Sequence, residues 1–196
     1  MHKSIMNFGN KVLTKELIEN KIVLNVGSLD VNGSWKSIIK SFKPKFYIGI
    51  DIQKGKGVDL TVAAEKLDTI YPEKLFDWIV STETLEHIEL WKEAILTMKK
   101  LLNLGGTLII TTRSRGCNYH PYPDDYWRYE IDDMKNIFSD FDISILEIDP
   151  EWPGVLMVAK KISEERRWLD DIELFKVDKD YDGLSDKLKI KTWQTL

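Results

Sequence analysis

The chain of 196 residues has little cysteine and histidine: it contains one cysteine, Cys117, and three histidines. A single cysteine cannot form an intramolecular disulfide, and the sequence has neither a CxxC pair nor a metal-type cluster of cysteines and histidines. We therefore expect a protein of the reducing cytoplasm. Hydrophobic residues make up 43% of the chain, which is enough for one well-developed core in a chain of single-domain length.

Long apolar segments and a strong excess of charge are also missing. The N-terminal sequence MHKSIMNFGNKVL lacks the apolar core of about 7 to 15 residues that a signal peptide has, and no stretch approaches the roughly 18 apolar residues of a membrane helix. The net charge is only -4 and the basic residues are scattered, which gives no field to attract nucleic acid. We predict a soluble protein with neither membrane nor nucleic-acid partners, and its oligomeric state stays open.

Charged residues become denser only after about Lys161. We therefore predict one domain over residues 1–161, which begins with a helical lead-in, and a charged C-terminal extension over residues 162–196. The extension could be an appended helix or partly disordered.

Short β-branched runs alternate with helical patterns, which is typical of βα units around a mostly parallel sheet. The predicted strands are residues 21–26, 46–51, 58–62, 76–81, 107–112, 141–148 and 154–160. The predicted helices are residues 34–42, 63–70, 89–102 and 131–138, and Gly105 and Gly106 are expected to end the third. The last two strands follow each other too closely for a helical crossover, so we expect an antiparallel hairpin at one sheet edge. The predicted fold class is α/β, with helices on both faces of the sheet.

The first strand leads into a glycine-containing turn, VLNVGSLDVNGS, over residues 23–34. Gly27 and Gly33 suit a turn whose backbone passes close to a ligand. The GxGxxG spacing of dinucleotide-binding loops is absent, because positions 28–30 carry Ser, Leu and Asp. A turn with so few glycines favours a ligand without a pyrophosphate.

Polar residues follow the second and fourth strands at the edge where open parallel sheets bind ligands. Asp51 ends the second strand at about the spacing from Gly33 at which an acid meets a ribose. Alone it would more simply cap a turn, but its pairing with the glycine turn favours the ligand. After the fourth strand come Ser81, Thr82, Glu83 and His87. Thr82 and Glu83 could instead cap a helix, with His87 on the surface.

Together these motifs resemble class I S-adenosylmethionine-dependent methyltransferases that act on small molecules, from about Lys21 to Lys161. The resemblance rests on NVGSLDVNGS, on Asp51, and on FDWIVSTETLEHI and LLNLGGTLIITT at the fourth and fifth strands. It implies a Rossmann-like seven-stranded sheet with a reversed last strand. It also implies an enzyme whose cofactor is S-adenosylmethionine.

The resemblance also implies roles for single residues. Gly27 and Ser28 would approach the methionine portion of the cofactor, and Asp51 would hold the ribose. Ile52 would pack on the adenine, and Thr82 would lie near the methyl group.

Two residues depart from the family's pattern. Asn25 occupies a place that is usually acidic, and Ala63 falls where an acid commonly contacts the adenine amino group. The backbone of Ala64 or the side chain of Glu65 would substitute for that acid. These departures keep open a non-catalytic module that has retained the fold.

An aromatic segment over residues 112–134 follows the fifth strand, and in similar methyltransferases this segment lines the acceptor pocket. The expected acceptor contacts are Arg113, Tyr119, Tyr122 and Trp127, the last of them partly structural. If the acceptor is a hydroxyl, His120 is the first candidate for a general base and His87 the second. Asp124, Asp125 and His120 have the chemistry of a metal site, but such short clusters are frequent by chance, and we expect no metal.

We predict methyl transfer to oxygen or nitrogen of an unidentified acceptor, and the low charge favours a small polar molecule. A nicotinamide-dependent reductase is a rival, although the chain lacks both GxGxxG and a Tyr-x-x-x-Lys pair after the fourth or fifth strand. The non-catalytic module is the second rival.

Overall fold

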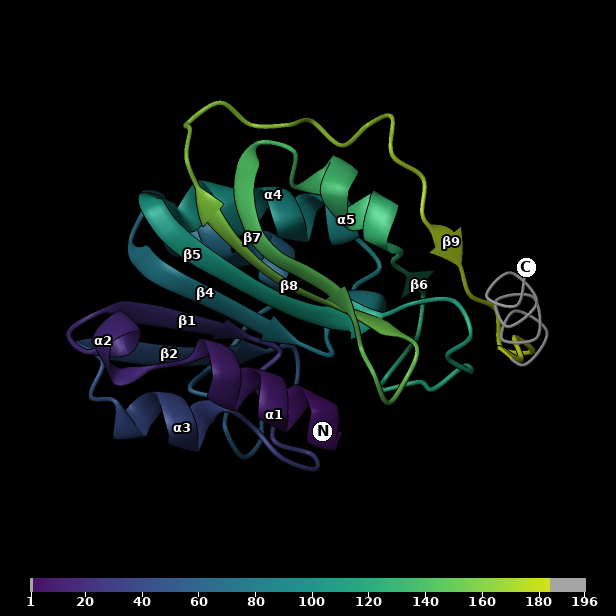
Figure 1. Ribbon diagram of the computed structural model, residues 1–196, viewed down its shortest axis with the longest axis horizontal. Coiled ribbons are helices and arrows are strands. Elements are labelled where there is room, and N and C mark those ends of the chain that lie inside the picture. The colour runs from purple at the N-terminus through teal and green to yellow at the C-terminus, as the bar shows by residue number, and fades with distance from the viewer. Residues whose placement is uncertain (1, 184–196) are drawn as a thin grey trace.

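The computed structural model describes residues 2–183, which fold around a seven-stranded sheet of order β3-β2-β1-β4-β5-β8-β7 (Figure 1). The strands are β1 (Ile22–Val26), β2 (Phe46–Asp51), β3 (Leu60–Thr61), β4 (Phe76–Thr82), β5 (Leu102–Arg113), β7 (Phe141–Ile148) and β8 (Gly154–Lys161). Strands β1 to β5 are mutually parallel, and β8 is antiparallel to both β5 and β7. The predicted α/β fold with an antiparallel C-terminal hairpin is therefore confirmed.

Helices cover both faces of the sheet (Figure 1). One face carries α1 (Lys3–Val12), α2 (Lys15–Ile18) and α3 (Lys36–Ser41), and the other carries η1 (Ala64–Thr69), α4 (Trp91–Leu101) and α5 (Ile131–Ile137). A short turn of helix, η2 (Leu85–His87), follows β4. No helix within residues 2–183 is both long and apolar enough to cross a membrane.

The apolar runs of the central strands reflect this double cover. Along β5, Leu108 and Ile110 pack into the core under α4 and α5, whereas Ile109 packs into the core under α1 and α3. All three are fully buried although alternate side chains of a strand point to opposite faces. A strand between two helix layers thus has no solvent-facing position that a polar residue would occupy.

Helix α4 ends one residue before the predicted end at Leu102, and the glycines that follow do not form its C-terminal cap. Its last residue is Leu101, and Leu102 already pairs with Phe76 of β4, so β5 begins directly at the helix end. Gly105, with φ of 77°, and Gly106 lie within the first part of β5, near a register shift between Phe76 and Trp78. The prediction that these glycines end the helix was wrong, because buried Leu102 pairs with β4 three residues before Gly105.

The chain after β8 returns across the face that carries α4 and α5 (Figure 1). Leu169, Ile172 and Val177 are buried there, and β9 (Phe175–Lys176) pairs with β6 (Trp127–Arg128) in a separate two-stranded sheet. Residues 162–183 of the predicted extension therefore lie against the domain, and residues 184–196 lie outside the described part of the chain.

A buried lysine ties α4 to the end of α5. Lys99 is fully buried, and its Nζ donates to the carbonyl oxygen of Ile137 and to Oδ1 of Asp140, both at 2.6 Å. Burial lowers the pKa of Lys99, and the Asp140 carboxylate opposes that effect. The ammonium group thus depends on Asp140 for a counter-charge.

Replacing Asp140 by alanine is expected to lower the free energy of unfolding by about 3 kcal/mol, because it leaves a buried charge without its partner. Urea unfolding at constant m-value measures this change. The matched control is Asp68→Ala, which breaks the half-exposed ion pair to the neighbouring Lys100 at 2.9 Å. Its expected cost is below about 1 kcal/mol, and equal costs for the two variants would contradict the role given to Lys99.

Candidate functional site

A cavity of about 770 Å³ opens at the carboxyl ends of β1, β2 and β4. Its walls come from the turn after β1, the end of β2, the segment after β4 and the segment between β5 and β6. Strands β1 and β4 are neighbours in the sheet, and the chain moves from β1 toward β2 on one side and from β4 toward β5 on the other. Open α/β sheets bind ligands at such a switch point.

The turn after β1 is held against β4 by a close contact at Gly27. This residue has φ of 73°, and a Cβ atom added to it would overlap the side chain of Thr84. Thr84 in turn donates from Oγ1 to the carbonyl oxygen of Thr82 at 2.9 Å. Glycine is thus required here by its backbone conformation and by a protein neighbour, and not only by the approach of a ligand.

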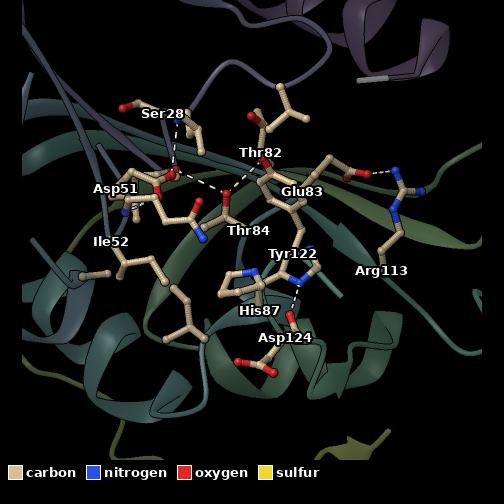
Figure 2. A pocket seen from close by; sticks show the side chains of 18 of the residues that line it. Ser28, Asp51, Ile52, Thr82, Glu83, Thr84, His87, Arg113, Tyr122 and Asp124 are labelled. Atoms are coloured by element: carbon tan, nitrogen blue, oxygen red, sulfur yellow. Dashed lines mark hydrogen bonds and ion pairs between the residues drawn. The ribbon is translucent and has the colours of Figure 1, made fainter. Parts of the chain in front are cut away.

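Asp51 fixes the backbone at the edge of the cavity (Figure 2). Its Oδ2 accepts from the N–H of Leu29 at 3.2 Å, and its Oδ1 accepts from the N–H of Gln53 at 2.9 Å. The turn-capping role considered for this residue is therefore present. Since a carboxylate offers about four acceptor positions, Asp51 keeps capacity for a ligand. The neighbouring Ile52 lies in the same wall and is half exposed.

Asn25 brings a polar group to the base of the cavity. It is buried, and its Nδ2 donates to the hydroxyl oxygen of Tyr47 at 2.9 Å. Burial raises the pKa of Tyr47 to about 12, so the phenol is neutral at neutral pH. The Oδ1 atom of Asn25 is buried and has no hydrogen-bond partner in the described structure. An acceptor is thus available to a ligand at this point.

All the residues predicted to bind the cofactor line this one cavity. They are Asn25, Gly27, Ser28, Asp51, Ile52, Ala64, Glu65 and Thr82. The sequence motifs that were separate along the chain therefore meet at one place.

Arg113 also lines the cavity, but its charge is already paired. It forms ion pairs with Glu83, as Figure 2 shows, and with Asp149, whose Oδ2 lies 3.4 Å from Nη1. Glu83 itself has φ of 53°, and its N–H donates to the carbonyl oxygen of Thr111 at 2.8 Å. Between these two carboxylates, Arg113 joins β5 to the segment after β4 rather than presenting a free cation to an acceptor.

His87 and His120 meet in the wall of the cavity. Their rings pack edge to face with centroids 5.0 Å apart. The Nδ1 atom of His87 lies 2.5 Å from the carbonyl oxygen of Asp124 (Figure 2). The Nδ1 atom of His120 lies 3.1 Å from Oδ2 of Asp125. Both predicted candidates for a base are thus fixed by acceptors on the same segment.

A buried ion pair controls the charge of His120. Arg128 donates from Nη1 and Nη2 to the two oxygens of Asp125 at 2.6 and 2.7 Å. Burial raises the pKa of Asp125, but the bonds from Arg128 and His120 outweigh it and hold that pKa well below its usual range. Burial lowers the pKa of His120, yet Asp125, Cys117 and Glu86 together raise it to about 10. A histidine that keeps its proton at neutral pH is poorly suited to act as a general base.

The remaining acceptor candidates divide into two groups. Tyr122 lines the cavity and is half exposed, whereas neither Tyr119 nor Trp127 is part of its wall. The indole Nε1 of Trp127 donates to the carbonyl oxygens of Ile88 and Glu89, so this ring secures the segment after β4. The contacts of Trp127 thus agree with the structural role that was expected beside acceptor binding.

Sequence reasoning missed three residues of this region. His2 and Trp152, whose rings stack at 5.0 Å, line the cavity from segments remote from every motif. No local signal identifies them. Glu86 is fully buried beside the two histidines, and its position directly before His87 was the only sequence signal for it.

Comparisons with known proteins agree with this geometry. The family described as methyltransferase domain matches residues 6–175, a range that includes every residue predicted to bind the cofactor or the acceptor. No curated protein matches the chain.

Several crystal structures share the fold. An S-adenosylmethionine dependent methyltransferase from Mesorhizobium loti aligns with a TM-score of 0.63 and 14% identity over 81% of this chain and 98% of that chain. The N-methyltransferase NodS from Bradyrhizobium japonicum WM9, in complex with S-adenosyl-L-homocysteine, aligns with a TM-score of 0.63 and 14% identity over 83% of this chain and 89% of that chain.

A third structure is the 1,6-didemethyltoxoflavin-N1-methyltransferase from Burkholderia thailandensis, with bound 1,6-didemethyltoxoflavin and S-adenosylhomocysteine. It aligns with a TM-score of 0.60 and 14% identity over 81% of this chain and 78% of that chain. At such identities the likeness establishes the fold.

The contact between Gly27 and Thr84 can be tested by a double-mutant cycle. Gly27→Ala is expected to cost at least about 2 kcal/mol of unfolding free energy, from the left-handed backbone and the overlap with Thr84. Thr84→Gly removes the overlapping atoms, so the double variant should lose about 1 kcal/mol less than the sum of the single variants. Strictly additive costs in chemical denaturation would show that Thr84 is not the reason for the glycine.

Proposed function

Since the chain belongs to the methyltransferase domain family, we propose that it is an S-adenosylmethionine-dependent methyltransferase that acts on oxygen or nitrogen of a small polar acceptor. The observation that carries the proposal is the continuous cavity, which joins the residues expected to bind the cofactor to the segment expected to bind the acceptor. Two of the similar proteins were crystallised with S-adenosylhomocysteine, the product of the same cofactor, which supports this choice.

The polar groups of the cavity fit the cofactor's amino acid end. The buried atoms Asn25 Oδ1 and Ser28 Oγ both have no hydrogen-bond partner within residues 2–183. Asn25 Oδ1 can accept from an ammonium group, and Ser28 Oγ can donate to a carboxylate. Asn25 therefore keeps the acceptor function of the acid that is usual at this place, without its charge.

The adenosine end fits the opposite wall. Asp51 can accept from ribose hydroxyls while it holds the backbone of Leu29 and Gln53. The exposed face of Ile52 offers apolar surface to the adenine, and Glu65 and the backbone at Ala64 lie in the same wall. When bound, S-adenosylmethionine supplies a methyl carbon that its sulfonium centre makes electrophilic.

The protein's contribution is to align the acceptor and exclude water. Thr82 ends β4 and Glu83 follows it, and both line the cavity together with the segment that carries His120 and Tyr122. The cavity volume of about 770 Å³ lies within the range of small-molecule sites. Together with the scattered basic residues, this volume favours a small acceptor over a polymer.

Asp51→Asn is expected to weaken the binding of S-adenosylmethionine by about 10- to 100-fold, because it removes a charge from hydrogen bonds to the ribose. Isothermal titration of the wild type and the variant measures the change. Thermal unfolding of Asp51→Asn checks that the turn is intact, since Asp51 also accepts from Leu29 and Gln53.

The control variant is Asp68→Asn, whose carboxylate pairs with Lys100 outside the cavity and should leave binding unchanged. A parallel titration with NADPH tests the reductase, and wild-type affinity for S-adenosylmethionine weaker than millimolar would favour the non-catalytic module. Mass spectrometry of metabolites methylated by the active protein then identifies the acceptor.

A further inference from the structure

Three potential metal ligands face one another at the acceptor end of the cavity. The Oε1 atom of Glu86 lies 3.9 Å from Nε2 of His87 and 4.0 Å from Nε2 of His120. One ligand atom from each of the three residues lies within 4.8 Å of the other two. Both histidines line the cavity, whereas Glu86 lies behind them, fully buried.

Glu86 has an unsatisfied oxygen at this point. Its Oε2 accepts from Oγ1 of Thr112 at 2.9 Å, but its Oε1 has no hydrogen-bond partner among the described residues. A buried carboxylate oxygen without a partner is costly, because it has lost its water and gained nothing in return. The position of Oε1 therefore calls for a cation or a donor between it and the two imidazoles.

In its neutral form each histidine would direct the lone pair of Nε2 toward Glu86, and a metal ion bound there takes the place of the Nε2 proton of His120. A carbonyl oxygen can only accept, so the contact with Asp124 places the proton of neutral His87 on Nδ1. In the same way, Nδ1 of His120 faces Oδ2 of Asp125 and the carbonyl oxygen of Asn118, both at 3.1 Å. Metal-binding histidines are typically held in this manner, with the second ring nitrogen donating to a carboxylate or carbonyl.

We propose that Glu86, His87 and His120 bind one divalent transition-metal ion, of the class of Zn²⁺, Co²⁺ or Mn²⁺. Two imidazoles and one carboxylate suit such ions, whereas Ca²⁺ and Mg²⁺ prefer all-oxygen sites. Donors about 2.1 Å from a tetrahedral ion lie about 3.4 Å apart. The distance from Glu86 Oε1 to each Nε2 must therefore shorten by about half an ångström, and the ligand nitrogens of the two histidines, which lie within 4.8 Å of each other, must also approach. The site replaces the expectation of no metal.

The ligand set differs from the acidic pair in the sequence that suggested a metal. Asp125 is already bound by Arg128, and Asp124 uses its backbone carbonyl to orient His87. These two residues therefore orient the histidines through their Nδ1 atoms. The carboxylate that completes the set comes from η2, at the end of β4.

Three protein ligands leave coordination positions open toward the cavity, as in catalytic metal sites. Given the proposed function, an acceptor hydroxyl can occupy such a position and lose its proton to solvent more readily. The acceptor oxygen then forms a bond to the methyl carbon, while the electron pair of the broken carbon–sulfur bond remains on sulfur. The metal thus favours a hydroxyl acceptor and takes over the part first assigned to His120 as a base.

Metal binding is tested on the full chain after dialysis against a chelator and then against buffer. Titration with Zn²⁺, and with Co²⁺ followed by its visible absorption, should give one ion per chain. Because the loss of a supporting contact alone weakens metal sites by about 10- to 100-fold, Glu86→Gln and His87→Gln should each weaken binding by at least about 100-fold. Circular dichroism of the metal-free variants checks their folding. If Glu86→Gln does not fold, the metal affinity of His87→Gln tests the ligand set.

Two matched controls are His2→Gln and Asp124→Asn. His2 lines the same cavity without belonging to the cluster, and Asp124 contributes its carbonyl oxygen, which the substitution keeps. Both controls should bind the ion as the wild type does. Loss of binding in Asp124→Asn with retention in Glu86→Gln would overturn the proposed ligand set.

The metal proposal and the proposed function fail separately, because the metal titrations contain no S-adenosylmethionine. Absence of one-to-one binding by the wild type, or equal affinity for Mg²⁺ and Zn²⁺, overturns the metal site and leaves cofactor binding untouched. Conversely, a chain that binds Zn²⁺ through Glu86 and His87 but not S-adenosylmethionine supports the site and contradicts the methyltransferase proposal.

Discussion

The architecture of the site depends on the place where β1 and β4 end side by side. The chain leaves these neighbouring strands in opposite directions, so their carboxyl ends border a space that no covering helix fills. Contact between Gly27 and Thr84 fixes the two departing segments against each other across this space. This contact positions the turn after β1, on the cofactor side of the cavity, relative to the segment after β4.

The acceptor side depends on a second, electrostatic constraint. The Arg128 guanidinium is fully buried, pairs with Asp125, and donates to the carbonyl oxygens of Cys117 and Asn118 at 3.1 and 3.0 Å. One side chain therefore satisfies both a carboxylate and the backbone of the segment that carries His120. A planar group with five donors is suited to this task, and lysine could not replace it. Removal of Arg128 would therefore take away the hydrogen bonds that hold the segment carrying His120, as well as the charge that pairs with Asp125.

The sheet and the cofactor side could be predicted because their signals are local. Buried strands read as apolar runs, and Asn25, Gly27 and Asp51 lie in short motifs at strand ends, so topology alone brings them together. The acceptor side could not be predicted in the same way. Trp127 is aromatic and close to the site in sequence, yet its indole donates to backbone after β4, and this depends on how two distant segments pack.

Glu86 is the clearest case of a residue that sequence could not interpret. It follows Glu83, and both look like exposed acids beside a helix cap. Glu83 pairs with Arg113, whereas among the described residues Glu86 is buried with no lysine or arginine partner and has only the two histidines about 4 Å from its Oε1. The cavity end thus holds more carboxylates than its two buried arginines neutralise. A proton on His120, whose pKa rises to about 10, and a divalent ion between Glu86 and the histidines are alternative counter-charges for the same excess. The ion supplies twice the charge and a fixed geometry, which is why the arrangement of nitrogen and oxygen atoms favours it.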